Sequence, residues 1–338
     1  MMSIKERLFA LSNVDGIGYV SEASDLACEM LSEYCLCEKG ENLTVFGFLN
    51  GESDYTIMLD AHIDQIGMVV TNVDDKGFLT LAKSGGIDLR SLPSKRVTVH
   101  GKEKVTAVFC STPPHLSKGD VEYSDIAEIK LDTTLGEKAK DVISVGDYVT
   151  FSTTPDELVG SRVSGRSFDD RAGVTCLIEV AKRLSTKKLP VNVAFVLSDG
   201  EELGLRGART ASFKVNPDEA VVIDVSFGSG IGISEEESGN LGKGPMMELS
   251  PILDKGVCKK ILEVADETGI EYQLKALGSR TGTNADVISI NREGVKTGTL
   301  AIPLCNMHTD CEIVDIKDIE SVCDILEAYI LSGGVKNV

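Results

Sequence analysis

The stretch VNVAFVLSDGEE, residues 191–202, indicates the fold class of this chain. Its first seven residues are apolar except for Asn192, which is the pattern of a strand covered on both faces. Comparable short runs, which we also expect to be strands, occur at 55–59, 220–223 and 299–304. Apolar residues at helical spacing lie between and beside these runs, at 21–34, 172–184, 261–265 and 317–331. Strands that alternate with helices predict an α/β fold with a mixed, largely parallel sheet sandwiched by helices.

The middle of the chain has a different pattern. Short β-prone runs at 77–82, 96–99 and 105–109 are separated by turn-forming residues such as Ser84-Gly85-Gly86. Short strands at this spacing are typical of a small all-β barrel or sandwich. We therefore expect an α/β domain built from residues 1–67 and 155–338, with an all-β barrel domain of residues 68–154 inserted into it.

The composition excludes several classes of partner. With 53 acidic and 34 basic residues, the 338-residue chain has a formal net charge of −19. Nucleic acids and anionic membranes both attract basic surfaces, so we expect neither as a partner. No segment reaches the roughly 20 apolar residues of a membrane helix. Nine cysteines without a framework spacing, and an N-terminus without the apolar part of a signal peptide, predict a cytoplasmic protein with reduced thiols.

Histidines and carboxylates gather at the ends of the predicted strands and at the start of a helix. In open α/β sheets, ligands bind outside the carboxyl ends of the strands. Imidazole and carboxylate together form the ligand set that zinc, cobalt or manganese accepts. Each residue also has an ordinary structural interpretation, such as a helix cap or a solvated loop, and only their joint occurrence favours a metal site. The residues are His62, Asp169, Asp170, Glu201, Glu202, Asp224 and His308.

Seven stretches, in the same order, make the chain similar to the M42 family of metallo-aminopeptidases, the glutamyl-aminopeptidase-like and tetrahedral-aminopeptidase group. The resemblance covers nearly the whole chain. The stretches are MLDAHIDQIG (58–67), GGID (85–88), PPHL (113–116), FDDRAG (168–173), EELGLRGA (201–208), DV (224–225) and MHTDCE (307–312).

The resemblance implies a site for two divalent metal ions per subunit, of zinc, cobalt or manganese. Asp169 would bridge both ions, His62 and Asp224 would complete one, and Glu202 and His308 the other. Because adjacent glutamates cannot easily hold one ion together, Glu202 would bind metal and Glu201 would be free to act as general base.

The resemblance assigns further roles around this site. Asp64, two residues after His62, would orient its imidazole. Such an enzyme would release residues from the free N-terminus of peptide substrates. The inserted domain of the family mediates dimerisation and its members often build twelve-subunit tetrahedral shells, so a homo-oligomer is implied.

The chain also departs from the family's pattern beside the expected ligands. Thr283-Asn284-Ala285 replaces Thr-Asp-Ala, and Thr309-Asp310 follows His308 in place of Ser-Pro. These differences leave the substrate preference open. The alternatives are a two-metal amidohydrolase or deacylase of small N-acyl compounds, an endoglucanase, and a non-catalytic assembly protein. Paired carboxylates also serve glycosidases, but aromatic residues are only 5% and tryptophan is absent, which weighs against a carbohydrate cleft.

Overall fold

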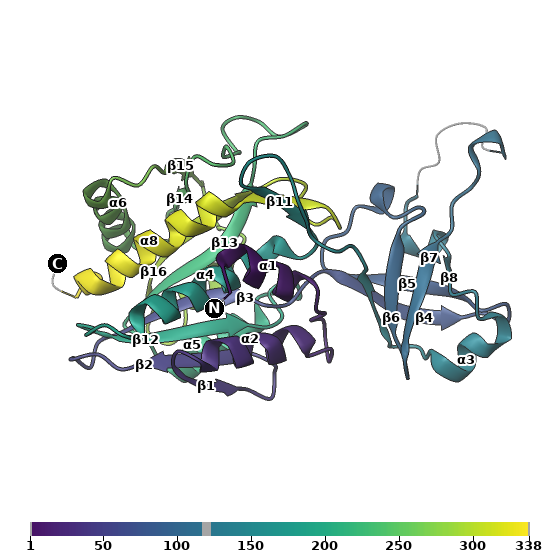
Figure 1. The fold of residues 1–338 in the computed structure, drawn as a ribbon, viewed down its shortest axis with the longest axis horizontal. Coiled ribbons are helices and arrows are strands. Elements are labelled where there is room, and N and C mark those ends of the chain that lie inside the picture. Colours follow the sequence, from purple (N-terminus) through teal and green to yellow (C-terminus); the bar gives the residue numbers. More distant parts are fainter. Residues whose placement is uncertain (1, 117–122, 337–338) are drawn as a thin grey trace.

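The larger body of the computed structural model, which describes residues 2–116 and 123–336, is built on an eight-stranded sheet (Figure 1). In spatial order the strands are β1 (Leu36–Lys39), β2 (Val45–Leu49), β12 (Asn192–Ser198), β3 (Thr56–His62), β13 (Glu219–Phe227), β16 (Lys296–Leu304), β14 (Met246–Leu249) and β15 (Gln273–Ala276). The four central strands are parallel to one another, and an antiparallel pairing flanks them on each side, β2 with β12 and β14 with β16. This is the mixed, largely parallel sheet that the sequence predicts.

Helices cover both faces of this sheet, as expected from the apolar run at 191–197. Along β12, Val193 and Phe195 pack into one hydrophobic core, whereas Ala194 and Val196 pack into another. Successive side chains of a strand point to opposite faces, so one apolar run supplies both cores. The first core contains α1 (Ile4–Ser12), α2 (Glu22–Ser32), α4 (Phe168–Leu184), α6 (Lys255–Thr268) and α8 (Ile316–Ser332), and the second contains α5 (Arg206–Val215) and α7 (Ala285–Ile288).

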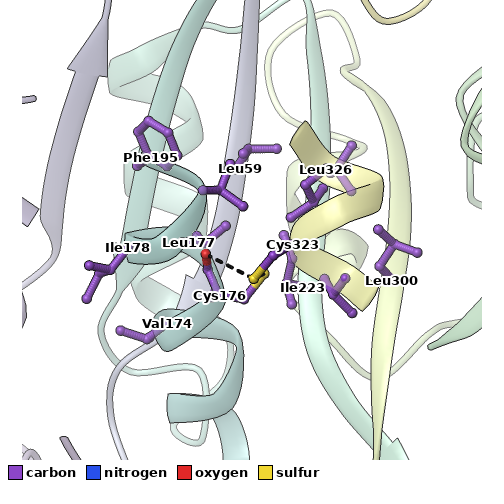
Figure 2. Close-up of a cluster of buried hydrophobic side chains, with 14 of the residues drawn as sticks. Leu59, Val174, Cys176, Leu177, Ile178, Phe195, Ile223, Leu300, Cys323 and Leu326 are labelled. Carbon is purple, nitrogen blue, oxygen red and sulfur yellow. Dashed lines mark hydrogen bonds between the residues drawn. The ribbon is translucent and has the colours of Figure 1, made fainter. Parts of the chain in front are cut away.

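The first core is densely filled between α4, α8 and the sheet (Figure 2). Cys176 of α4 and Cys323 of α8 face each other there, with their Sγ atoms 3.2 Å apart. Leu59 and Phe195 reach this core from the sheet and are fully buried. Each such side chain contributes about 1.5–3 kcal/mol relative to an exposed one, so this layer holds the parallel strands in place.

A second, smaller body is a closed antiparallel barrel with its own hydrophobic core (Figure 1). This confirms the predicted all-β fold of the middle region and shows that it is a barrel and not a sandwich. Short helices lie in the loops around the barrel. They are the α-helix α3 (Ala139–Val142) and the 3₁₀ helices η1 (Leu89–Ser91), η2 (Pro114–Leu116), η3 (Ile126–Glu128) and η4 (Gly136–Lys138). Its strands, in order around the barrel, are β4 (Gly67–Val73), β5 (Phe78–Ser84), β8 (Leu131–Asp132), β7 (Lys104–Phe109), β6 (Arg96–His100) and β9 (Tyr148–Phe151).

The chain returns from the barrel through a small three-stranded sheet of β10 (Asp156–Glu157), β11 (Arg162–Gly165) and β17 (Glu312–Asp315). This sheet ties the end of the loop after β16 to the segment that precedes α4. Within the described residues, no helix has the length and apolar character needed to cross a membrane.

Two strands extend beyond their predicted ends. Strand β3 continues through Asp60 and Ala61, so His62 is its last residue and does not follow it in a loop. Strand β13 continues past Asp224 to Phe227, because its parallel pairing with β16 runs on to Leu304. Asp224 therefore lies inside a strand, where the sequence had predicted the strand's end.

Candidate metal centre

Side chains from five separate segments converge at the carboxyl ends of the parallel strands. They come from the end of β3, the start of α4, the loop after β12, the middle of β13 and the loop after β16. All of the predicted ligands are brought together in this way. Their ligand atoms form three groups, each within 4.8 Å: His62, Asp169 and Asp224; Asp169, Glu202 and His308; and His62, Glu201 and Glu202.

Asp169 belongs to two of these groups and lies between two histidines. Its Oδ1 is 3.0 Å from Nε2 of His62, and its Oδ2 is 3.2 Å from Nε2 of His308. Each histidine also faces a second carboxylate. Oε1 of Glu202 is 3.3 Å from Nε2 of His308, and Oδ1 of Asp224 is 4.0 Å from Nε2 of His62. One carboxylate shared between two imidazole–carboxylate groups is the arrangement that bridges a pair of cations in two-metal hydrolases.

Asp64 contacts both the histidine that ends β3 and the loop after β12. Its Oδ1 lies 3.4 Å from Nδ1 of His62, on the side of the ring opposite Asp169. The same carboxylate accepts hydrogen bonds from the backbone N–H groups of Glu201, at 3.0 Å, and Glu202, at 3.2 Å. It therefore lies where a partner that orients His62 would be needed, and it also holds the two glutamates in place.

Glu312 is a residue of this site whose importance the sequence did not reveal. Its buried carboxylate accepts hydrogen bonds from the backbone N–H groups of Phe168 (2.7 Å), Asp169 (3.2 Å) and His308 (3.0 Å). The backbone is irregular at both places: Asp169 is non-helical inside α4, and His308 has a φ of +60°. Glu312 thus joins the two turns that carry the shared carboxylate and one histidine. The only sequence signal was its place in the stretch 307–312.

The cluster contains more carboxylates than its two histidines can balance in charge. Burial raises the pKa of Asp224 and Asp170 well above the ordinary value, and neighbouring aspartates add to the effect. Burial also raises the pKa of Glu201 to about 8, with Glu202 contributing and His62 opposing. Asp170 Oδ2 is buried without a hydrogen-bond partner among the described residues. Buried carboxylates of this kind are stable when protonated or when paired with cations.

The same negative charges also raise the pKa of both histidines. Burial on its own would lower the pKa of His308, but its contacts with Asp169 and Glu202 raise it to about 11. Hydrogen bonds with the two histidines hold the pKa of Asp169 well below its usual range, despite burial. The cluster therefore attracts positive charge strongly, and divalent cations match both its charge and its ligand types.

The sequence pattern of M42 glutamyl aminopeptidases matches residues 44–325, which includes every residue of the cluster. The chain belongs to the M42 glutamyl aminopeptidase family. The aminopeptidases of this family are metal-dependent, and the cluster is a possible metal site. A lysyl aminopeptidase of Pyrococcus furiosus is 30% identical over 282 residues, which cover 81% of this chain and 81% of that protein.

Solved structures share the whole architecture of this M42 chain. An aminopeptidase from the archaeon Desulfurococcus kamchatkensis superposes with a TM-score of 0.91 at 28% identity, covering 98% of this chain and 96% of that one. The TET1 peptidase of Pyrococcus horikoshii, which can assemble into a tetrahedron or a large octahedral shell, gives a TM-score of 0.86 at 29% identity. In that comparison, 97% of this chain and 99% of the other are covered.

The barrel contributes to the site through the loop after β5. A Cβ atom placed on Gly86 would lie 2.7 Å from Nδ1 of His308, and one on Gly85 would lie 3.0 Å from Oε2 of Glu202. Only glycine allows the loop backbone to approach so closely. The stretch 85–88, which the sequence marked only as part of the inserted domain, therefore packs directly on the predicted metal ligands.

A second contact joins the barrel to the loop after β16. Lys95 Nζ lies 2.8 Å from Oδ1 of Asp310, and the hydroxyl of Thr153 donates to Oδ2 at 2.8 Å. Asp310 is one of the positions where the chain departs from the family's pattern. Its buried carboxylate ties the loop that carries His308 to residues at the base of the barrel.

A cavity of 370 Å³ opens beside the cluster. The predicted metal ligands and Glu201 form one part of its wall. The remainder comes from the end of β13, from β14 and β15, and from the segments around Thr283 and Met307. The cavity is therefore large enough for part of a small ligand next to the cluster.

Proposed function

We propose that this chain is a metal-dependent aminopeptidase that releases residues one at a time from the N-terminus of peptides. The observation that carries the proposal is the position of Asp169, shared between two imidazole–carboxylate groups in a chain of the M42 family.

The donor set fits two divalent cations. His62 and Asp224 would hold one ion, Glu202 and His308 the other, and Asp169 both. The observations in favour are the approach of Asp169 to both histidines, the raised pKa of the neighbouring carboxylates and the unpartnered Oδ2 of Asp170. Nitrogen and oxygen ligands of this kind accept zinc, cobalt or manganese.

Divalent cations bound there would polarise the scissile carbonyl and lower the pKa of an attacking water. Glu201 would take a proton from that water and return it to the leaving amine. The surplus of carboxylates would attract the positively charged α-amine of a free N-terminus.

A peptide panel tests this function. Protein stripped with a chelator is given peptides with free and with acetylated N-termini, with and without added zinc, cobalt or manganese, and the products are followed by mass spectrometry. We expect metal-dependent, stepwise loss of single residues from free N-termini alone. Preferential release of acyl groups would instead support an amidohydrolase, and hydrolysis of cellulose that survives chelation would support an endoglucanase.

We also propose that the protein forms a homo-oligomer through its inserted domain, residues 68–154. The structural similarity to a TET peptidase that assembles into closed shells supports this, as do exposed apolar side chains on the barrel at Val108, Leu116 and Val145. Native mass spectrometry should give a dimer or a multiple of it, up to twelve subunits. A monomer at micromolar concentration would contradict the proposal.

We further propose a cytoplasmic location. All nine cysteines lie among the described residues and are free thiols. Thiols persist in this form in reducing compartments. Fractionation of the cells that produce the protein, followed by detection with an antibody, would test the location.

A further inference from the structure

Two oppositely charged side chains line the cavity without belonging to the metal cluster. Glu248 of β14 and Lys275 of β15 are direct neighbours across the parallel pairing of these strands. Lys275 Nζ lies 3.4 Å from Oε1 of Glu248 and donates to the hydroxyl of Ser226 at 2.8 Å. The Ser226 hydroxyl in turn lies 3.4 Å from the same Glu248 oxygen. The three groups form one connected polar unit in the cavity wall.

This unit is largely shielded from water. The side chain of Glu248 is 3% exposed and that of Lys275 is 12% exposed. Burial raises the pKa of Glu248, and the charge of Lys275 opposes that rise. Glu248 Oε2 is closed off from solvent beside Thr299. The groups that therefore remain for a ligand are Oε1 of Glu248, the Ser226 hydroxyl and the Lys275 ammonium, which has three hydrogens to donate. The unit therefore keeps hydrogen-bonding capacity for a ligand.

The unit lies next to the place where chemistry would occur. Asp224 and Ser226 are two residues apart in β13, so their side chains point to the same face of the sheet. If an aminopeptidase holds the scissile bond at the metal cluster, the side chain of the first residue must occupy the space left in the same cavity. The whole cavity, including the part beside the cluster, measures 370 Å³, so the space that remains suits one side chain and not a longer peptide segment.

We propose that Glu248 and Lys275 select the first side chain of the substrate, and that they favour uncharged side chains which can both accept and donate hydrogen bonds, asparagine and glutamine above all. This inference rests on the proposed function. An amide oxygen would accept from Lys275, and its NH₂ group would donate to Glu248 or Ser226.

Charged side chains fit this unit less well because its two charges already balance each other. An acidic side chain that approaches Lys275 also meets the carboxylate of Glu248, and a basic one that approaches Glu248 also meets the ammonium of Lys275. In a water-poor cavity, like charges at short distance are strongly unfavourable. An apolar side chain would displace water from this pair without offering it a hydrogen bond, which is also costly.

The test compares peptides that differ only in their first residue: Asn against Asp, freshly prepared Gln against Glu, and Lys and Leu. We expect kcat/KM for the amides to exceed that for the isosteric acids and for Lys by about tenfold or more, because unpaired polar groups in a binding site discriminate strongly. A ranking led by acidic, basic or apolar residues would overturn the inference.

Single substitutions then separate the two charges. Glu248→Gln leaves Lys275 unopposed and should raise kcat/KM for Asp and Glu peptides relative to Asn and Gln peptides by about tenfold. Lys275→Gln leaves Glu248 unopposed and should raise kcat/KM for Lys peptides relative to Asn and Gln peptides by a similar factor. The matched controls are Glu271→Gln and Lys243→Gln, an exposed pair 3.9 Å apart outside the cavity, which change the net charge equally and should leave the ranking unaltered.

The outcomes distinguish this inference from the proposed function. Release of N-terminal residues in a different order contradicts the inference alone, whereas no cleavage of any free N-terminus contradicts the function and the inference with it. Equal losses for all peptides in both variants would show a purely structural pair. The double variant Glu248→Gln/Lys275→Gln removes both charges, leaves the net charge unchanged and should keep amide side chains first in the ranking. If a single variant does not fold, the ranking measured with the wild-type protein still tests the inference.

Discussion

Glu201 and Glu202 are adjacent in the chain but have different surroundings. Glu202 contacts His308, whereas Glu201 shares a group only with His62 and Glu202. We predict that Glu201→Gln lowers kcat by about 10²–10⁴-fold, the usual contribution of a general base, while metal content stays unchanged. Elemental analysis and peptide kinetics measure both quantities. Glu202→Gln is the comparison variant and should lose metal as well as activity; equal metal loss in both variants would argue against a general-base role for Glu201.

Glu312 provides a second prediction at the level of a single residue. Its two carboxylate oxygens accept from three backbone N–H groups, and an amide in the same place has only one accepting oxygen. Glu312→Gln should therefore loosen the turns at Asp169 and His308 and weaken metal binding by about 10–100-fold, as loss of supporting hydrogen bonds does elsewhere. Competition with a fluorescent chelator measures the affinity.

The control for that variant is Glu320→Gln, an exposed position eight residues further along the chain. It should bind metal as the wild type does. Wild-type affinity in Glu312→Gln would show that the turns are held by other contacts.

The sequence and the structure agree best on the residues whose chemistry is carried by side chains. The residues named as ligands could be selected because histidines and carboxylates at strand ends are unusual, and the structure brings them into one cluster, although their roles stay predictions. Glu312 could not be selected in the same way, because its partners are backbone N–H groups in turns whose conformation the sequence does not show. The proposed selection by Glu248 and Lys275 likewise depends on a strand register that no pattern in the sequence indicates.

Among the secondary-structure elements, the apolar strands were predicted more reliably than their ends. Strand β13 was expected to end before Asp224 because its apolar run stops there, yet its pairing with β16 continues to Phe227. Backbone pairing does not depend on side-chain polarity. A strand whose last residues are polar because they belong to a functional site is therefore longer than its apolar pattern predicts. The last residues of β3, Asp60 to His62, were missed for the same reason.

The loop after β5 gives a prediction at this scale. A methyl group at Gly86 would lie 2.7 Å from the ring of His308 and would force one of the two segments to move. Gly86→Ala should weaken or abolish one of the two proposed metal sites, the one that includes His308, and leave the other occupied. Metal stoichiometry per subunit measures this directly. Gly278→Ala, where a Cβ meets nothing within 4 Å, is the matched control and should retain full occupancy.

At the scale of the whole molecule, the metal cluster joins segments that are far apart in sequence, so its charge state should control global stability. Without cations, the folded protein holds protons that the unfolded chain releases. The pKa of Glu201 is raised from 4.5 to about 8, and that of His308 from 6.5 to about 11. Raised values mean that these groups stabilise the fold at low pH and lose that effect as the pH rises. The effect of Asp169 on stability has the opposite sign, because its pKa is lowered. That effect changes only below about pH 3.8, outside the range from pH 5 to pH 8.

The metal-free protein should therefore become less stable between pH 5 and pH 8, whereas the metal-loaded protein should gain stability, because cations bind the deprotonated ligands. At a free metal concentration of 100 times Kd, each occupied site adds about 2.7 kcal/mol to the free energy of unfolding. The gap in melting temperature between samples with zinc and with chelator should widen from pH 5 to pH 8. In Glu201→Gln, which removes one of the titrating groups, the slope of the metal-free curve should be shallower. A metal-free protein that is more stable at pH 8 than at pH 5 would show that other groups, and not this cluster, dominate the pH dependence of the fold.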